Sequence, residues 1–219
     1  MPGTHPSPET TSEWTQRITY WMTRLLRRVS THWLLLANLG FALFLGLPIV
    51  APILFHWGLN GPAELIHRVF APLCHQLPER SFFLFGPQTV YSYEELALQL
   101  GGSTVPQRMV GTPELGFKMA VCERDIAVYG AMVLAGIAFQ WLRPRLRPLT
   151  ARQFVLFILP MAIDGGGQLI GLWSSTWLTR VITGVLFGIA CIGLTYPYLE
   201  QGMREVRTET AATIARWER

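Results

Sequence analysis

Polar side chains that could do chemistry gather in three short segments between strongly apolar ones. The first, residues 74–81, puts a thiol, an imidazole, a carboxylate and a guanidinium within eight positions. The second is residues 121–125 and the third is residues 164–168. The side chains they contribute are Cys74, His75, Gln76, Glu79, Arg80, Ser81, Cys122, Arg124, Asp125, Asp164 and Gln168. Because all three segments lie near the ends of apolar runs, we expect them to converge on one site.

A metal site is the first function that these residue types suggest. Cys74 and Cys122 could supply thiolates to zinc or another transition metal ion, with His75, Asp125 or Asp164 completing the ligand set. Adjacent helical residues point about 100° apart, so Cys74 and His75 could share an ion only where the chain is irregular. The three cysteines of the chain form no C-x-x-C pair, so their count alone identifies neither a metal site nor a disulfide framework.

The same residues leave other functions open. Cys74 and Cys122 could form a disulfide or act in membrane thiol redox chemistry, although active exchange uses paired cysteines. Arg80, Arg124 and Arg180 could bind or transport a small anion, or hold a lipid headgroup. Alternatively, the polar residues only fix helix packing in a structural or accessory subunit. The sequence identifies no catalytic residue and no organic cofactor site, so it does not decide whether the protein is an enzyme.

The composition is that of a membrane protein. Half of the 219 residues are hydrophobic and only 15% are charged, against about a quarter in soluble domains. The arginines flank apolar segments instead of forming a basic face, so nucleic acid is not an expected partner. We predict an all-α integral membrane protein, a bundle of four transmembrane helices within residues 31–200. The four spans are expected at residues 33–55, 121–142, 154–173 and 177–199.

The remaining segments are expected outside the bilayer core. Residues 1–11 are rich in proline and predict a disordered tail. Residues 12–30 predict an amphipathic helix on the membrane surface, or else an extension of the first span. Residues 56–120 predict a small extracytoplasmic insert, and residues 201–219 a cytoplasmic tail.

Two short helices are expected within the insert. Residues 62–70 have one apolar side but are too short to span, so we expect an interfacial helix that delivers Cys74 to the membrane surface. Residues 93–100 predict a second helix, with Ser92 and Glu95 forming a capping box at its start.

Charge placement predicts the topology. Arginines precede the first span, fill the short loop after the second and follow the last, which places these three regions in the cytoplasm. The expected protein is therefore a multi-pass plasma membrane protein with both termini cytoplasmic and the polar clusters facing outward. Its expected partners are the lipid bilayer and either a second copy of the chain or another membrane subunit.

Charged residues inside the spans are expected to pair. Left unpaired in hydrocarbon, Arg124, Arg180, Asp125 and Asp164 would each cost at least about 2.5 to 3.5 kcal/mol. Counting about 1.5 Å per residue from the outer helix ends, Asp125, Gln168 and Arg180 fall within roughly 5 to 10 Å of the outer surface. We therefore predict one polar layer in which Asp164 pairs with Arg124 or Arg180.

The motifs resemble a known family. The residues that carry the likeness are Cys74-His75-Gln76, Pro78-Glu79-Arg80-Ser81, Cys122-x-Arg124, Asp164-Gly165 with Gln168, and Arg180 with Thr183-Gly184. Their order and spacing resemble the prokaryotic membrane family catalogued as domain of unknown function 2085, over roughly Leu54 to Gly188. The resemblance implies a membrane fold and the motif positions, but no activity. In some members a second cysteine stands at the position of Asp125, where an aspartate can still bind a metal but cannot exchange disulfides.

Overall fold

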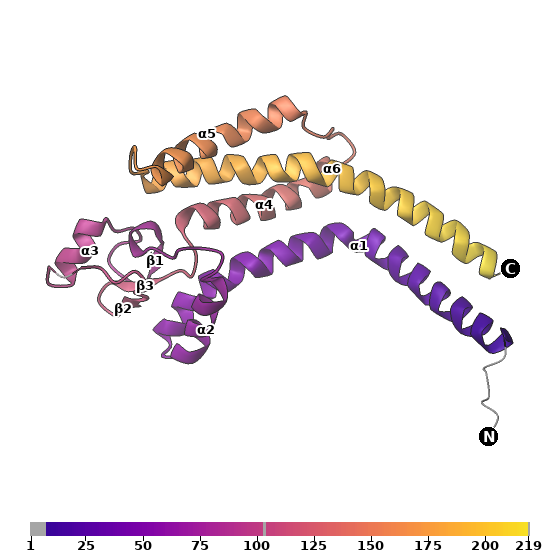
Figure 1. Ribbon diagram of the computed structural model, residues 1–219, viewed down its shortest axis with the longest axis horizontal. Coiled ribbons are helices and arrows are strands. Elements are labelled where there is room, and N and C mark those ends of the chain that lie inside the picture. Colours follow the sequence, from indigo (N-terminus) through magenta and orange to yellow (C-terminus); the bar gives the residue numbers. More distant parts are fainter. Residues whose placement is uncertain (1–7, 103, 219) are drawn as a thin grey trace, which may run out of the picture.

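The computed structural model describes residues 8–102 and 104–218, and within them the chain is mostly helical (Figure 1). The elements in chain order are α1 Pro8–His56, α2 Asn60–Phe70, a 3-10 turn at Pro78–Arg80, β1 Phe83–Leu84, α3 Tyr93–Gln99, β2 Gly111–Thr112, β3 Gly116–Lys118, α4 Glu123–Leu142, α5 Ala151–Leu169 and α6 Trp177–Trp217.

Three of the described helices, α1, α4 and α6, are long and apolar enough to cross a membrane. Helix α5 has 19 residues, but polar residues at both of its ends lower its mean hydropathy, and it is not among these three helices. The membrane character of the chain is therefore confirmed, while the predicted count of four spans is not. The predicted third span, residues 154–173, also ends too late, because the chain leaves the helix at Leu169 and turns at Gly171 with a φ of +76°.

The N-terminal part differs from the prediction. Residues 12–30 do not form a separate surface helix but are the first part of α1, which runs unbroken from Pro8 to His56. No glycine or proline separates the two predicted segments, so nothing in the backbone stops the helix there. Pro48 and Pro52 lie inside α1 without ending it. Of the tail predicted at residues 1–11, residues 1–7 lie outside the described residues and the rest are helical.

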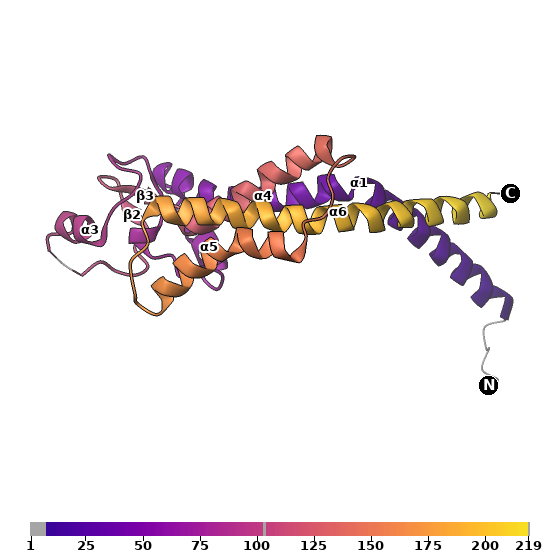
Figure 2. The same cartoon turned by 90° about the horizontal axis from the view of Figure 1, so that it is seen from above.

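The long helices lie side by side around α6. Helices α4 and α5 flank α6 on opposite sides, and the second half of α1 runs along α4 and α6 (Figures 1 and 2). The close approach of α4 and α6 is possible because of Gly184 and Gly188, where an added Cβ would lie 2.9 Å from the Arg124 carbonyl oxygen and 2.4 Å from that of Val128. A methyl group at either position would force these two helices apart.

The two described chain ends lie together at one end of the molecule. The first half of α1 and the last half of α6 extend beyond the other helices in the same direction (Figure 1), and the rings of Tyr20 and Trp217 are 5.7 Å apart. The predicted tail at residues 201–219 is thus helical as far as Trp217, as a continuation of α6. Where α1 and α6 meet, Trp33, Phe139 and Tyr196 form a buried aromatic cluster.

The insert lies at the opposite end (Figure 1). Its two predicted helices are present as α2 and α3, and Ser92 and Glu95 form the predicted capping box. It also holds a three-stranded antiparallel sheet of order β1-β3-β2, which the sequence analysis did not predict. The strands are only two or three residues long, too short to produce a visible alternation of apolar and polar residues. The β2–β3 hairpin closes at Gly116, whose φ of +84° suits a glycine.

Candidate functional site

The fold brings Cys74, Cys122 and Asp125 together beneath the insert. One ligand atom from each residue lies within 4.8 Å of the other two, and all three side chains are half-buried. Cys74 follows α2, Cys122 caps α4, and Asp125 lies in the first turn of α4. The Cys122 thiol donates to Asp125 Oδ2 at 3.1 Å, and the Cys122 backbone N–H donates to Cys74 Sγ at 3.3 Å. Both thiols therefore point at the same small space.

A buried network fixes the turn that carries Cys74. Gln76 has a φ of +54°, in the left-handed region that residues other than glycine rarely adopt. Its amide Nε2 donates to the His67 carbonyl oxygen at 2.8 Å, and its Oε1 lies 3.2 Å from His67 Nδ1. Its own carbonyl oxygen accepts a hydrogen bond from the fully buried Lys118 ammonium. The insert thus positions Cys74 through two side chains that do not touch the thiol group.

Burial perturbs the titration of this network. It lowers the pKa of His67 to about 4, with the nearby Lys118 charge acting in the same direction. Burial also lowers the pKa of Lys118 to about 8, against the opposing influence of Cys74 and Glu79. Contact with the Cys122 side chain lowers the pKa of the Cys74 thiol.

A pocket of about 290 Å³ opens beside the two thiols. It is lined by residues of all three polar clusters together with α6. The lining residues are Leu73, Cys74, His75, Gln76, Leu77, Arg80, Cys122, Arg124, Asp125, Met161, Gln168 and Arg180. The predicted convergence of the three clusters is therefore present in the structure.

His75 differs from the other candidate metal ligands. It lines the pocket, but its side chain is exposed and is not part of the group formed by Cys74, Cys122 and Asp125. The chain is irregular at residues 74–77, so helix geometry does not decide this, and the structure directs only the Cys74 side chain to the Cys122 thiol. Asp164 is also outside the group, since it forms an ion pair instead.

Two ion pairs hold the helices around the pocket. Arg124 donates to Asp164 Oδ2 at 2.5 Å, and Ser175 Oγ donates to Asp164 Oδ1 at 2.8 Å. Asp164 thus pairs with one of its two expected partners. Arg180 pairs with Glu123 at 2.8 Å, and the Glu123 carboxylate is fully buried. These pairs join α4 to α5 and α4 to α6.

Several hydrogen-bond donors around the pocket have no partner among the described residues. They are Arg124 Nε, Arg180 Nε and Gln168 Nε2. Each belongs to a residue that lines the pocket, and Arg180 is only 6% exposed. Buried donors normally find a partner, so each of these three needs an acceptor such as water or an anion.

Two of the predicted site residues have other roles. Ser81 is fully buried and donates to the Leu77 carbonyl oxygen, which closes the turn at Pro78–Arg80. Glu79 does not line the thiol pocket but a neighbouring polar pocket of about 570 Å³, between the insert and the α5–α6 loop. Arg80 and Arg180 line both pockets and separate them.

Sequence reasoning missed the supporting residues. They are His67, Lys118 and Glu123. Lys118 is the chain's only lysine, but its apolar neighbours Phe117 and Met119 do not indicate its burial, because successive side chains of a strand point to opposite faces. For Glu123 the signal is its position in an apolar segment, where a carboxylate needs a cationic partner.

The fold and the site together define a helical membrane protein with a thiol and carboxylate cluster walled by arginines. A family model described as "Predicted membrane protein (DUF2085)" matches residues 114–194, which confirms the resemblance. The match contains the second and third clusters and Arg180, and it begins after residues 74–81.

One relative is also uncharacterised. The chain is 27% identical over 129 residues to an uncharacterised protein of the archaeon Methanocaldococcus jannaschii. The alignment covers 58% of this chain and 64% of the relative, which is less than two thirds of the relative's length. No solved structure matches the chain.

Proposed function

We propose that this membrane protein binds a transition metal ion, with zinc the best fit, through Cys74, Cys122 and Asp125. The observation that carries the proposal is that one ligand atom of each residue lies within 4.8 Å of the other two. Cys122 and Asp125 are three positions apart on α4, whereas Cys74 precedes Cys122 by 48 positions. Two thiolates and a carboxylate suit zinc, whose ligands are Cys, His and Asp or Glu. A metal ion would take the place of the proton that Cys122 now shares with Asp125.

Three protein ligands leave the fourth tetrahedral position free, as in zinc sites that bind a water or a substrate. Here that position would face the pocket of about 290 Å³. Its unpartnered donors, on Arg124, Arg180 and Gln168, favour an anionic or oxygen-rich ligand beside the metal. Anion binding in this pocket without a metal is the second candidate function, and it rests on the same donors.

The proposal includes the membrane arrangement. We place α5 across the bilayer as a fourth span, since 19 residues at about 1.5 Å each reach roughly 28 Å. We place the protein in the plasma membrane with both termini cytoplasmic and the insert outside. The arginines after α4 and after the apolar part of α6 support this orientation. A second copy or another membrane subunit remains an expected partner beside the bilayer.

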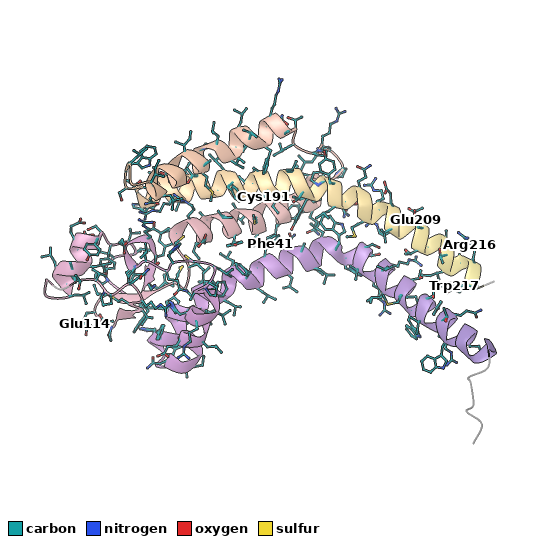
Figure 3. All side chains as sticks on the ribbon, viewed as in Figure 1. Phe41, Glu114, Cys191, Glu209, Arg216 and Trp217 are labelled. Carbon is teal, nitrogen blue, oxygen red and sulfur yellow. The ribbon has the colours of Figure 1, made fainter. Side chains whose placement is uncertain are left out.

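Differential alkylation of the three cysteines in the purified, detergent-solubilised chain tests the proposal. With Zn²⁺ present, Cys74 and Cys122 should resist alkylation and become reactive after a chelator, without any reductant. Cys191 lies midway along α6, away from the insert (Figure 3), so its reactivity should not change. Release of Cys74 and Cys122 by reductant alone would indicate a disulfide instead. If neither the chelator nor the reductant changes the alkylation of Cys74 and Cys122, the metal site is excluded, and anion binding or a purely structural network remains.

A further inference from the structure

A second polar cluster surrounds Glu200 on α6, away from the thiol site. The Trp33 indole N–H donates to Glu200 Oε2 at 2.9 Å, and Arg207 donates to Oε1 at 2.9 Å. Arg204 and Arg143 lie 3.6 and 4.0 Å from the same carboxylate. One buried carboxylate is therefore surrounded by three guanidinium groups, which leaves an excess of positive charge.

This excess faces a pocket. Arg143, Arg147 and Arg204 line a space of about 420 Å³ between the α4–α5 loop and α6, and Glu200 is the one acidic residue among its lining residues. The loop is docked on α6 through the Leu149 N–H, which donates to the Gly193 carbonyl oxygen at 3.2 Å. The arginines are thus presented by a fixed surface, and an anion would complete their neutralisation.

An apolar groove begins where this pocket ends. It has a volume of about 640 Å³ and is lined by residues of α4, α5 and α6. Small α4 residues such as Gly130 and Ala138 line it, together with Phe157 of α5. An added Cβ at Gly130 would meet nothing within 4 Å, so the groove has room for a chain of methylene groups.

The pocket and the groove are adjacent, because Phe139 and Leu146 line both. Together they form a site that is cationic at one end and apolar along its length. We propose that an anionic phospholipid binds here, with its phosphate at Arg143, Arg147 and Arg204 and one acyl chain between α4 and α5. A transmembrane helix from another subunit would fill the groove but would not neutralise the arginines. Basic pockets beside spans are known to hold anionic headgroups.

Native mass spectrometry of the full chain in detergent tests the proposal, with phosphatidylglycerol and phosphatidylcholine of identical acyl chains as probes. We expect one phosphatidylglycerol to be retained per chain and phosphatidylcholine to be released. Arg147→Gln should weaken phosphatidylglycerol binding at least about tenfold, the usual effect of losing a charge-assisted hydrogen bond. Arg147 has no hydrogen-bond or ion-pair partner among the described residues, so this change should leave the fold intact.

Two matched controls separate the contribution of the lipid headgroup from that of the acyl chain. Arg145→Gln removes the same charge from the same loop, outside the pocket, and should not change binding. Gly130→Leu should fill the groove and displace the lipid. Gly40→Leu also enters open space, but on α1 outside the groove, and should retain the lipid.

Three results would overturn the proposal. Equal retention of both lipids would show that the arginines do not select a headgroup. Equal loss in Arg145→Gln and Arg147→Gln would indicate general attraction by the loop charges. Inorganic phosphate that binds the detergent-solubilised chain and is lost in Arg147→Gln but not in Gly130→Leu, with no lipid retained, would assign the pocket to free phosphate.

Discussion

Gln76 stabilises the turn that carries Cys74 and contributes no ligand itself. Its left-handed backbone is held by Lys118 and His67, both buried. This turn, which most residues would avoid, is therefore held in part by Lys118, 42 positions further along the chain. Changes at His67 or Lys118 should act on the thiol site through this turn.

Acid should weaken the fold through His67. Its pKa is about 4 in the folded chain, below the ordinary 6.5, so the unfolded chain binds the proton first. The associated stability is complete above pH 6.5 and is lost as the pH falls towards 4, by up to about 3 kcal/mol. Melting of the detergent-solubilised protein between pH 7 and 4.5 measures this loss.

His67→Asn keeps a donor for Gln76 but removes the titrating ring, so its melting temperature should fall less steeply with acid. The exposed His32→Asn is the matched control and should keep the wild-type slope. Equal slopes in all three proteins would contradict the role assigned to His67.

The Arg124–Asp164 pair should couple α4 to α5. Asp164→Asn leaves the half-buried Arg124 without its carboxylate and should lower the unfolding free energy by up to about 3 kcal/mol. Adding Arg124→Gln to the Asp164→Asn variant removes the unpaired positive charge and should recover part of the lost unfolding free energy. Unfolding of the two single variants and the double variant in mild detergent measures the coupling, and simple additivity would contradict it.

At the residue scale, the cost of burying an isolated charge was enough to predict an ion pair from the sequence. Contacts that depend on the tertiary fold could not be predicted in this way. The pairing of Asp164 followed from the cost of an isolated charge in an apolar segment. The separation of His75 from the thiols did not follow from helix geometry, because residues 74–77 are not helical. The burial of Lys118 depends on a hairpin that the sequence pattern did not reveal.

At the element scale, capping residues gave the most accurate boundaries. Ser92 and Glu95 correctly predicted the start of α3. A second capping box, Thr150 with Gln153, begins α5 at Ala151, three residues before the predicted start. Where no such signal exists, between residues 30 and 33, the predicted break was wrong and α1 continues.

The packing of α4 on α6 should depend on Gly188. An alanine there would place its Cβ 2.4 Å from the Val128 carbonyl oxygen and 2.8 Å from the Ala131 Cβ. Gly188→Ala should therefore destabilise the protein by about 1 to 3 kcal/mol. Gly202→Ala lies further along α6 in open space and should stabilise it by up to about 1 kcal/mol. Melting in detergent measures both, and a stabilising Gly188→Ala would contradict the close packing.

At the scale of the whole molecule, the pocket beside Cys74 and Cys122 and the pocket lined by Arg143, Arg147 and Arg204 lie at different ends of the helical bundle. The insert covers the first, and the α4–α5 loop borders the second. Apolar runs and flanking arginines were sufficient to predict a helical membrane protein with a polar site at one end. They could not predict the sheet, whose short strands depend on pairing with one another and on packing against α1.

The proposed orientation places these ends on opposite sides of the bilayer. A fluorescent protein that folds only in the cytoplasm should be active when fused after Arg219, and inactive when inserted near Gly102 in the insert. A periplasmic phosphatase reporter should give the reverse pattern. Cytoplasmic activity at both positions would contradict the proposed topology.

The central claim is that Cys74, Cys122 and Asp125 bind one metal ion. The most direct test is the metal content per chain of the protein purified in mild detergent, compared with its Cys74→Ser, Cys122→Ser and Cys191→Ser variants. We expect one equivalent of zinc or a similar ion in the wild type and in Cys191→Ser, and a loss of that ion in the other two variants. Metal-free wild-type protein after loading with Zn²⁺ and removal of the excess, or equal metal content in all four proteins, would contradict the claim.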